Sequence, residues 1–111
     1  MTDPNLIALV RLLNKTKVPL YRTVAQKIQK PRRNRVDVNI GKLKRYTEAG
    51  DTVIVPGKVL AAGKLEHALT VAALSFSEQA QLQIEKVQGS CITLEELVEK
   101  NPEGKGLKII I

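Results

Sequence analysis

The sequence has few of the residues on which covalent and metal chemistry depend. It contains one cysteine and one histidine in 111 residues, no tryptophan, and only 3% aromatic residues. A lone Cys91 excludes an intramolecular disulfide and favours a reducing compartment, and we expect it to be a small buried residue. A lone His67 excludes paired histidine ligands and a histidine-based triad, and we expect it to be an exposed turn residue. The scarcity of aromatic rings argues against a platform that stacks single-stranded bases.

Long apolar runs are missing as well. The one near the start, residues 6–13, is interrupted by Arg11 and is far too short to cross a bilayer. Asp3 in front of it does not fit a secretion signal. We therefore expect a soluble intracellular protein that has no membrane contact. A length of 111 residues with 43% hydrophobic content predicts one globular domain.

Acidic side chains are almost absent from the first half of the chain. Twelve of the 18 basic residues fall between Arg11 and Arg45, where Asp37 is the only acid. Residues 1–45 carry a formal charge of +10 and residues 46–111 a charge of −3, which gives the net +7. A positive field of this strength attracts a polyanion, and nucleic acid has the most densely spaced phosphates. A solvated face that serves solubility, or an adaptor surface for an acidic protein, is the alternative.

Two helices are predicted in this basic half. The first begins at Pro4, where Thr2 or Asp3 can cap it. Its apolar residues repeat at helical spacing, namely Leu6, Leu9, Val10 and Leu13. The second follows Pro19 and turns three apolar side chains inward, namely Tyr21, Val24 and Ile28. Residues 31–35 begin with a proline, which disfavours helix at the residue before it, and they are predicted to form an irregular basic arm.

The rest of the chain contains an internal repeat. Residues 38–55 align without a gap on residues 92–109, at an offset of 54. Each copy consists of an extended entry, a capping residue, a short amphipathic helix, a glycine and a strand. The capping residues are Asn39 in the first copy and Thr93 in the second. Chance similarity between two generic strand–helix–strand units is the alternative.

A third unit of the same order lies between the two copies. Residues 70–76 are predicted to form a strand, and Ser77 to cap a helix of about eleven residues that ends at Gly89. We therefore predict an α/β fold, an irregular superhelix of three β-β-α turns wound onto one core rather than an alternating open sheet. In a single domain, 1–111, a basic helical region and arm (1–35) precedes the repeat-like core (36–111).

The helices of the two copies differ in charge. Lys42, Lys44 and Arg45 in the first helix stand where the last helix has Glu96, a valine and Glu99. Because folding needs neither sign of charge, we infer that the first unit meets phosphate, while the last faces solvent or a basic neighbour.

Five landmarks of the sequence resemble one known family. They are KPRR (30–33), VNIGKLKRY (38–46), GDTVIVPGKVL (50–60), TVAALSFS (70–77) and NPEGKG (101–106). In this order they resemble the large-subunit ribosomal protein family L-eighteen-e, in its short archaeal form, which is related to the bacterial L-fifteen proteins. Ala61 is a departure, because a glycine is common there. The resemblance implies a β-β-α superhelix behind a basic N-terminal portion, and a structural protein of the cytoplasmic ribosome that binds large-subunit ribosomal RNA.

The residues predicted to contact RNA are basic or flank basic residues. Arginines in the arm offer flat, bidentate donors to phosphate, and lysines nearby add charge. Such contacts favour the recognition of folded RNA by its shape and backbone. The candidate RNA-binding residues are Lys27, Lys30, Arg32, Arg33, Asn34, Arg35, Lys42, Lys44, Arg45 and Lys58. The expected partners are ribosomal RNA and neighbouring large-subunit proteins, with no cofactor, metal or small-molecule substrate.

The loop at residues 56–64 is not a nucleotide-binding loop. Five residues separate Gly57 and Gly63, where that motif has four, and Lys64 lacks the hydroxyl residue that should follow it. We expect a glycine-hinged loop in which Lys58 touches RNA, and Lys64 either touches RNA or is solvated. Three acidic residues could be proposed as general acids, namely Asp37, Glu48 and Asp51. An ion pair with an arginine of the arm explains Asp37 better, and a turn after Gly50 explains Asp51 better. No enzymatic activity is predicted.

Overall fold

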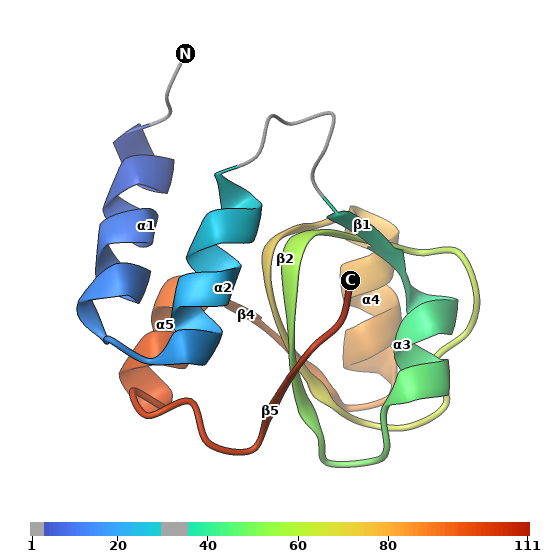
Figure 1. Cartoon of the computed structure of the whole chain (residues 1–111). Helices are drawn as coiled ribbons and strands as arrows, with labels where there is room; N and C mark the ends of the chain where they lie inside the picture. The colour runs from blue at the N-terminus through green and yellow to red at the C-terminus, as the bar shows by residue number, and fades with distance from the viewer. Residues whose placement is uncertain (1–3, 30–35) are drawn as a thin grey trace.

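The structure is a computed structural model that describes residues 4–29 and 36–111 (Figure 1). Its elements in chain order are α1 (Pro4–Lys15), α2 (Pro19–Ile28), β1 (Val36–Asn39), α3 (Ile40–Tyr46), β2 (Thr52–Leu60), β3 (Thr70–Phe76), α4 (Glu78–Lys86), β4 (Ser90–Thr93), α5 (Leu94–Lys100) and β5 (Leu107–Ile109). The predicted arm and the predicted caps Thr2 and Asp3 lie outside the described residues. No helix in the described ranges has the length and hydropathy of a membrane span.

The strands form one sheet in which every pair is parallel. The order is β1-β2-β3-β4, and β5 also pairs with β2. β1 and β5 pair with different parts of β2, residues 57–60 and residues 52–54. Parallel strands are usually covered on both faces, which explains why the middle of β2 and β3 is apolar in consecutive residues. The predicted α/β class is confirmed.

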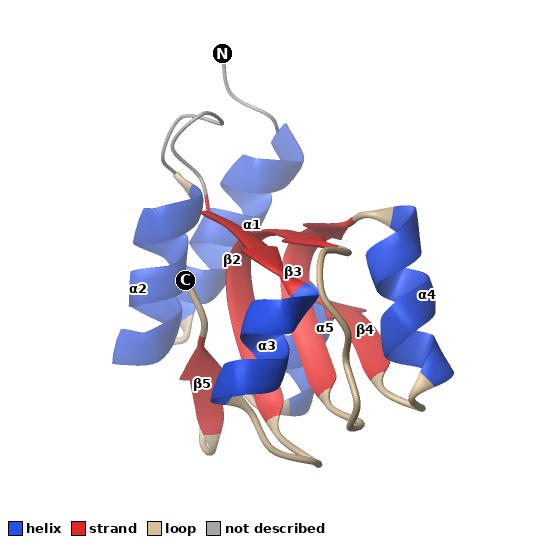
Figure 2. Cartoon of the chain, turned by 90° about the vertical axis from the view of Figure 1, so that its right-hand side faces the viewer, coloured by secondary structure: helices blue, strands red, loops and turns tan. Residues whose placement is uncertain are grey.

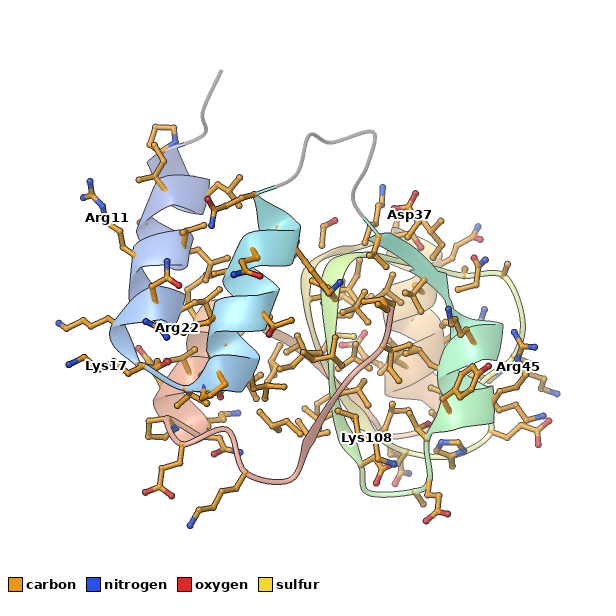
Figure 3. All side chains as sticks on the ribbon, in the orientation of Figure 1. Arg11, Lys17, Arg22, Asp37, Arg45 and Lys108 are labelled. Carbon is orange, nitrogen blue, oxygen red and sulfur yellow. The ribbon has the colours of Figure 1, made fainter. Side chains whose placement is uncertain are left out.

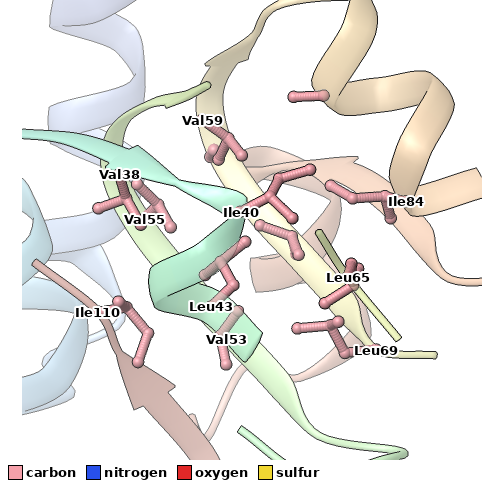
Figure 4. Packing of buried hydrophobic residues seen from close by; sticks show 13 residues of the cluster. Val38, Ile40, Leu43, Val53, Val55, Val59, Leu65, Leu69, Ile84 and Ile110 are labelled. Atoms are coloured by element: carbon pink, nitrogen blue, oxygen red, sulfur yellow. The ribbon is translucent and has the colours of Figure 1, made fainter. Parts of the chain in front are cut away.

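Helices cover both faces of this sheet (Figure 2). Side chains alternate along a strand, so Val53 and Val55 of β2 face one side and Ile54 faces the other. Val53 and Val55 belong to a cluster with side chains of α3 and α4, which Figure 4 shows at close range. Ile54 belongs to a second cluster, formed with side chains of α1, α2 and α5. The apolar residues therefore form two clusters and not the single core that we expected.

The internal repeat is visible in the structure. β1 and β4 have the same bounds at the offset of 54, and so do α3 and α5. Gly50 and Gly104, which are equivalent in the repeat, both have a positive φ, +87° and +69°. Thr93 accepts a hydrogen bond from the backbone N–H of Glu96, as predicted for a cap, whereas the side chain of Asn39 makes no such bond. Both predicted caps therefore occupy the N-cap position of their helix, but only Thr93 makes the capping hydrogen bond.

The N-terminal helices follow the predicted pattern. α1 buries Leu9 and Leu13, and α2 buries Tyr21 among its inward residues. Further along, Ser77 caps α4 as predicted, but α4 has nine residues and the left-handed residue behind it is Gln88, with a φ of +66°. Gly89 is required for a different reason, because a Cβ there would lie 2.5 Å from the carbonyl oxygen of Leu69.

Candidate nucleic-acid interface

Helix α3 displays basic side chains because its apolar residues hold the opposite side against the sheet. Ile40 and Leu43 are fully buried in the cluster that also contains Val53 and Val55 of β2. The helical period then turns Lys44 and Arg45 toward solvent, and both are exposed. Figure 3 shows Arg45 at the outer edge of the molecule, beyond α3. Two of the three predicted basic residues of α3 therefore lie on an accessible surface, and the third, Lys42, is half-buried.

Each cation of α3 also has a contact within the protein. Lys44 forms an ion pair of 3.0 Å with Glu66, in which both side chains are exposed. The hydrogen bond from Lys44 is the main cause that lowers the pKa of the Glu66 carboxyl. Lys42 donates a hydrogen bond to the backbone oxygen of Ile111. The guanidinium of Arg45 lies 5.9 Å from the centre of the Tyr46 ring. Surface contacts of this kind contribute little to stability, so a phosphate can replace them.

The loop after β2 packs against the start of α3. The backbone N–H of Gly41 donates to the carbonyl of Ala62 at 3.0 Å, and Gln83 of α4 donates to the carbonyl of Ala61 at 3.0 Å. Gly63 has a φ of +100°, and a Cβ on it would come within 2.5 Å of the backbone nitrogen of Gly41. Only glycine permits this approach.

This loop brings Lys64 to the α3 surface. The exposed Lys64 is close enough to Glu66 for its charge to lower the pKa of that carboxyl. The sequence left the role of Lys64 open, although the glycine beside it was a signal of close backbone approach. We call Lys42, Lys44, Arg45 and Lys64 the α3 basic surface.

Lys58 lies on a strand and not on a loop. Residues 56–60 belong to β2, so the glycine-hinged loop predicted there is shorter than expected. β2 is irregular between Val55 and Lys58, and a Cβ on Gly57 would lie 1.8 Å from the carbonyl oxygen of Val36. Lys58 is exposed and stands in register with Asp37 of β1.

The other predicted contact residues divide into two groups. Lys27 is half-buried on α2, and its helix packs on the opposite side of the sheet from α3. The described candidates therefore do not form one continuous surface. The remaining predictions lie outside the described residues, namely Lys30, Arg32, Arg33, Asn34 and Arg35.

Two other residues differ from expectation. His67 is half-buried, and its Nε2 lies 2.8 Å from the hydroxyl of Thr47. The Thr47 hydroxyl donates its hydrogen to the carbonyl of Leu43, so Nε2 of His67 is the donor in this contact. Cys91 is half-buried beside the α3–α4 cluster, and burial raises the pKa of its thiol to about 11. The prediction of an exposed His67 is wrong. A thiol with this raised pKa is protonated at neutral pH, which lowers its reactivity.

Comparison with known proteins identifies the family. Residues 3–110 match the model of the family described as ribosomal protein 60S L18 and 50S L18e. The chain belongs to this family. The large ribosomal subunit protein eL18 of Methanothermobacter thermautotrophicus is 46% identical over 113 residues, which cover 98% of this chain and 93% of that protein. The eL18 protein of Methanococcus maripaludis is 44% identical, with 98% and 94% covered.

Membership in this family confirms the resemblance found in the sequence. Its members are ribosomal proteins of the large subunit and not enzymes, and they work in the cytoplasmic ribosome. The prediction that the chain has no enzymatic activity is therefore confirmed by its family.

Proposed function

We propose that this ribosomal protein binds folded large-subunit ribosomal RNA through its basic half and thereby supports subunit assembly and translation. The coarser role, that of a large-subunit ribosomal protein, follows from the family. The contact with RNA rests on the charges and their placement.

The contrast between α3 and α5 carries the proposal. The two helices occupy equivalent positions of the repeat, have the same length, and each bury their apolar side against the sheet. α3 displays three cations and no acid, whereas α5 displays three acids and one lysine. Since the scaffold accepts either sign, the positive charge on α3 serves an external partner. An RNA backbone, with one charge on every phosphate, fits this surface best.

We propose the following roles for individual residues. Lys44, Arg45 and Lys64 bind phosphates on the α3 basic surface, and Lys42 adds charge beside them. Lys58 extends the contact along β2. The predicted arm contributes Arg32, Arg33 and Arg35 with Asn34 between them, and Lys27 and Lys30 precede it. Contacts of this kind position RNA by its backbone and shape rather than by base sequence.

We also propose that the acidic surface of α5 faces a neighbouring large-subunit protein. Glu95, Glu96 and Glu99 are exposed on this helix. Ribosomal RNA repels such a surface, so a basic protein is the better neighbour.

The salt dependence of binding to purified large-subunit ribosomal RNA tests the proposal. Each phosphate contact adds about −0.7 to −0.9 to the slope of log K against log salt. Replacing Arg32, Arg33 and Arg35 together with alanine should reduce the slope by about two to three, and Lys44→Gln with Arg45→Gln by about one to two. Circular dichroism checks that the fold survives.

A matched control removes two lysines from the acidic half, Lys86→Gln with Lys100→Gln, both exposed on α4 and α5. We expect its slope to equal that of the wild type. If all three variants keep the wild-type slope, the basic half is not the RNA-binding surface. Binding to an acidic protein in place of RNA would support the adaptor alternative.

A further inference from the structure

Helices α1 and α2 carry a second basic surface on the other side of the sheet. Residues 4–29 contain no aspartate or glutamate. Four exposed cations stand on this pair of helices and the turn between them, namely Arg11, Lys15, Lys17 and Arg22. No ion pair joins any of them to an acidic side chain of the described residues. We call these four residues the α1–α2 basic surface.

Both helices that carry this surface pack against the sheet. Leu9 and Leu13 of α1 pack with Tyr21 and Val24 of α2, and the cluster continues to Ile54 in the middle of the sheet. The hydroxyl of Tyr21 also donates to the backbone carbonyl of Asn101, behind α5. The four cations are therefore fixed to the domain.

The two basic surfaces point to different sides of the molecule. Figure 3 shows Arg11, Lys17 and Arg22 around the α1–α2 pair, and Arg45 on the far side beyond α3. A helix is about 10 Å across and a sheet layer adds about 10 Å, so about 30 Å of protein separates the surfaces. This distance is about three Debye lengths at 0.1 M salt. Each surface therefore attracts phosphate independently of the other.

We propose that the protein is a bridge between two separate segments of ribosomal RNA, one on the α3 basic surface and one on the α1–α2 basic surface. The inference rests on the proposed function, because RNA must occupy the α3 surface. It adds a second contact, which the candidate residues on α3 cannot make. The four unpaired cations of the α1–α2 basic surface favour RNA over an acidic protein. An RNA backbone presents closely spaced phosphates to both helices, whereas an acidic protein would need a surface of matching shape.

Cleavage of RNA from a tethered probe tests the bridge. Iron–EDTA is attached to Asn14→Cys on α1 or to Ala49→Cys behind α3, both exposed positions, in a Cys91→Ser background. Each labelled protein is bound to large-subunit ribosomal RNA at 0.1 M salt, and hydroxyl radicals are generated. The unlabelled Cys91→Ser protein is the control. We expect both probes to cut the RNA, at positions that are far apart in its sequence and do not overlap.

The other outcomes separate the two proposals. Cuts only from position 49 overturn the bridge and leave the proposed function standing. Cuts only from position 14 overturn RNA binding at α3 and with it the bridge, and cuts from neither overturn both. Cuts at the same nucleotides from both probes show one RNA segment, which also overturns the bridge.

Salt dependence gives a second, independent measure. The variant Arg11→Gln, Lys15→Gln, Lys17→Asn and Arg22→Gln removes the four charges, and asparagine accepts the φ of +59° at position 17. Between 0.05 and 0.2 M salt, the wild type should lose about 50- to 150-fold more affinity than this variant. Equal losses would contradict a second RNA contact.

Discussion

Truncation of Ile54 tests whether the basic helices are part of one cooperative domain. Ile54 is fully buried in the middle of β2, on the face covered by α1, α2 and α5. Ile54→Ala removes three carbon atoms, a transfer loss of about 0.8 kcal/mol each, and leaves a cavity that adds to it. We expect a destabilisation of about 3 kcal/mol, within the range of about 2–5 kcal/mol for such truncations.

Two related variants complete the experiment. Ile84→Ala makes the same deletion in the other cluster, on the face of the sheet that α3 and α4 cover. Ile84 belongs to α4 and is also fully buried. It should cost about as much as Ile54→Ala. Leu82→Ala on the same helix is the control, because Leu82 is 59% exposed and its truncation should cost less than about 0.5 kcal/mol.

Urea unfolding measures these costs with two signals. Far-ultraviolet circular dichroism reports all helices. Tyrosine fluorescence reports α2, because the chain has no tryptophan and Tyr21 is buried whereas Tyr46 is 58% exposed. Both signals should move together to a lower midpoint in Ile54→Ala and in Ile84→Ala. A fluorescence transition that separates from the dichroism transition would refute the single-domain reasoning.

Two further predictions concern single groups. Thr93→Ala should lower the free energy of unfolding by about 0.5–2 kcal/mol, because it removes the cap bond to Glu96. Asn39→Ala at the equivalent position should lower it clearly less, because Asn39 makes no such bond. Equal losses for the two variants in urea unfolding would contradict this prediction. The Cys91 thiol, with its pKa raised to about 11 from 9.0, should be alkylated by iodoacetamide at pH 8 about 100-fold more slowly than in the unfolded chain. Alkylation at the rate of the unfolded chain would contradict the burial of Cys91. Because the folded state favours the neutral thiol, the contribution of Cys91 to the free energy of unfolding is present below pH 9 and is lost as the pH rises toward 11.

Local patterns in the sequence predicted much of the fold. The spacing of apolar residues placed α1 and α2, because an amphipathic helix repeats its buried side every 3.6 residues. The glycines at positions 50 and 104 and the candidate caps placed the two copies of the repeat. These signals depend on the backbone conformation of single residues and need no knowledge of distant contacts.

Features that depend on distant contacts could not be predicted in the same way. Nothing in the order of residues indicates that β1 and β5 share one edge of β2, or that Gly57 is needed because β1 passes so close to it. The sheet divides the apolar residues into two clusters, a division that composition does not reveal.

The candidate site shows the same limit. The basic character of α3 was readable from the sequence, because it lies within one helix. The placement of Lys64 beside α3 follows from the contact between Gly63 and Gly41, residues 22 positions apart in the chain. The location of Lys27 on the far side of the sheet likewise depends on how α2 packs.

Ultraviolet crosslinking of assembled large subunits, followed by mass spectrometry of the peptides, tests the central claim most directly. If the basic half binds ribosomal RNA together with Lys58 and Lys64, crosslinks will fall on peptides of residues 11–64, with Arg45 and its neighbours among them. Crosslinks confined to residues 78–111 would contradict the account.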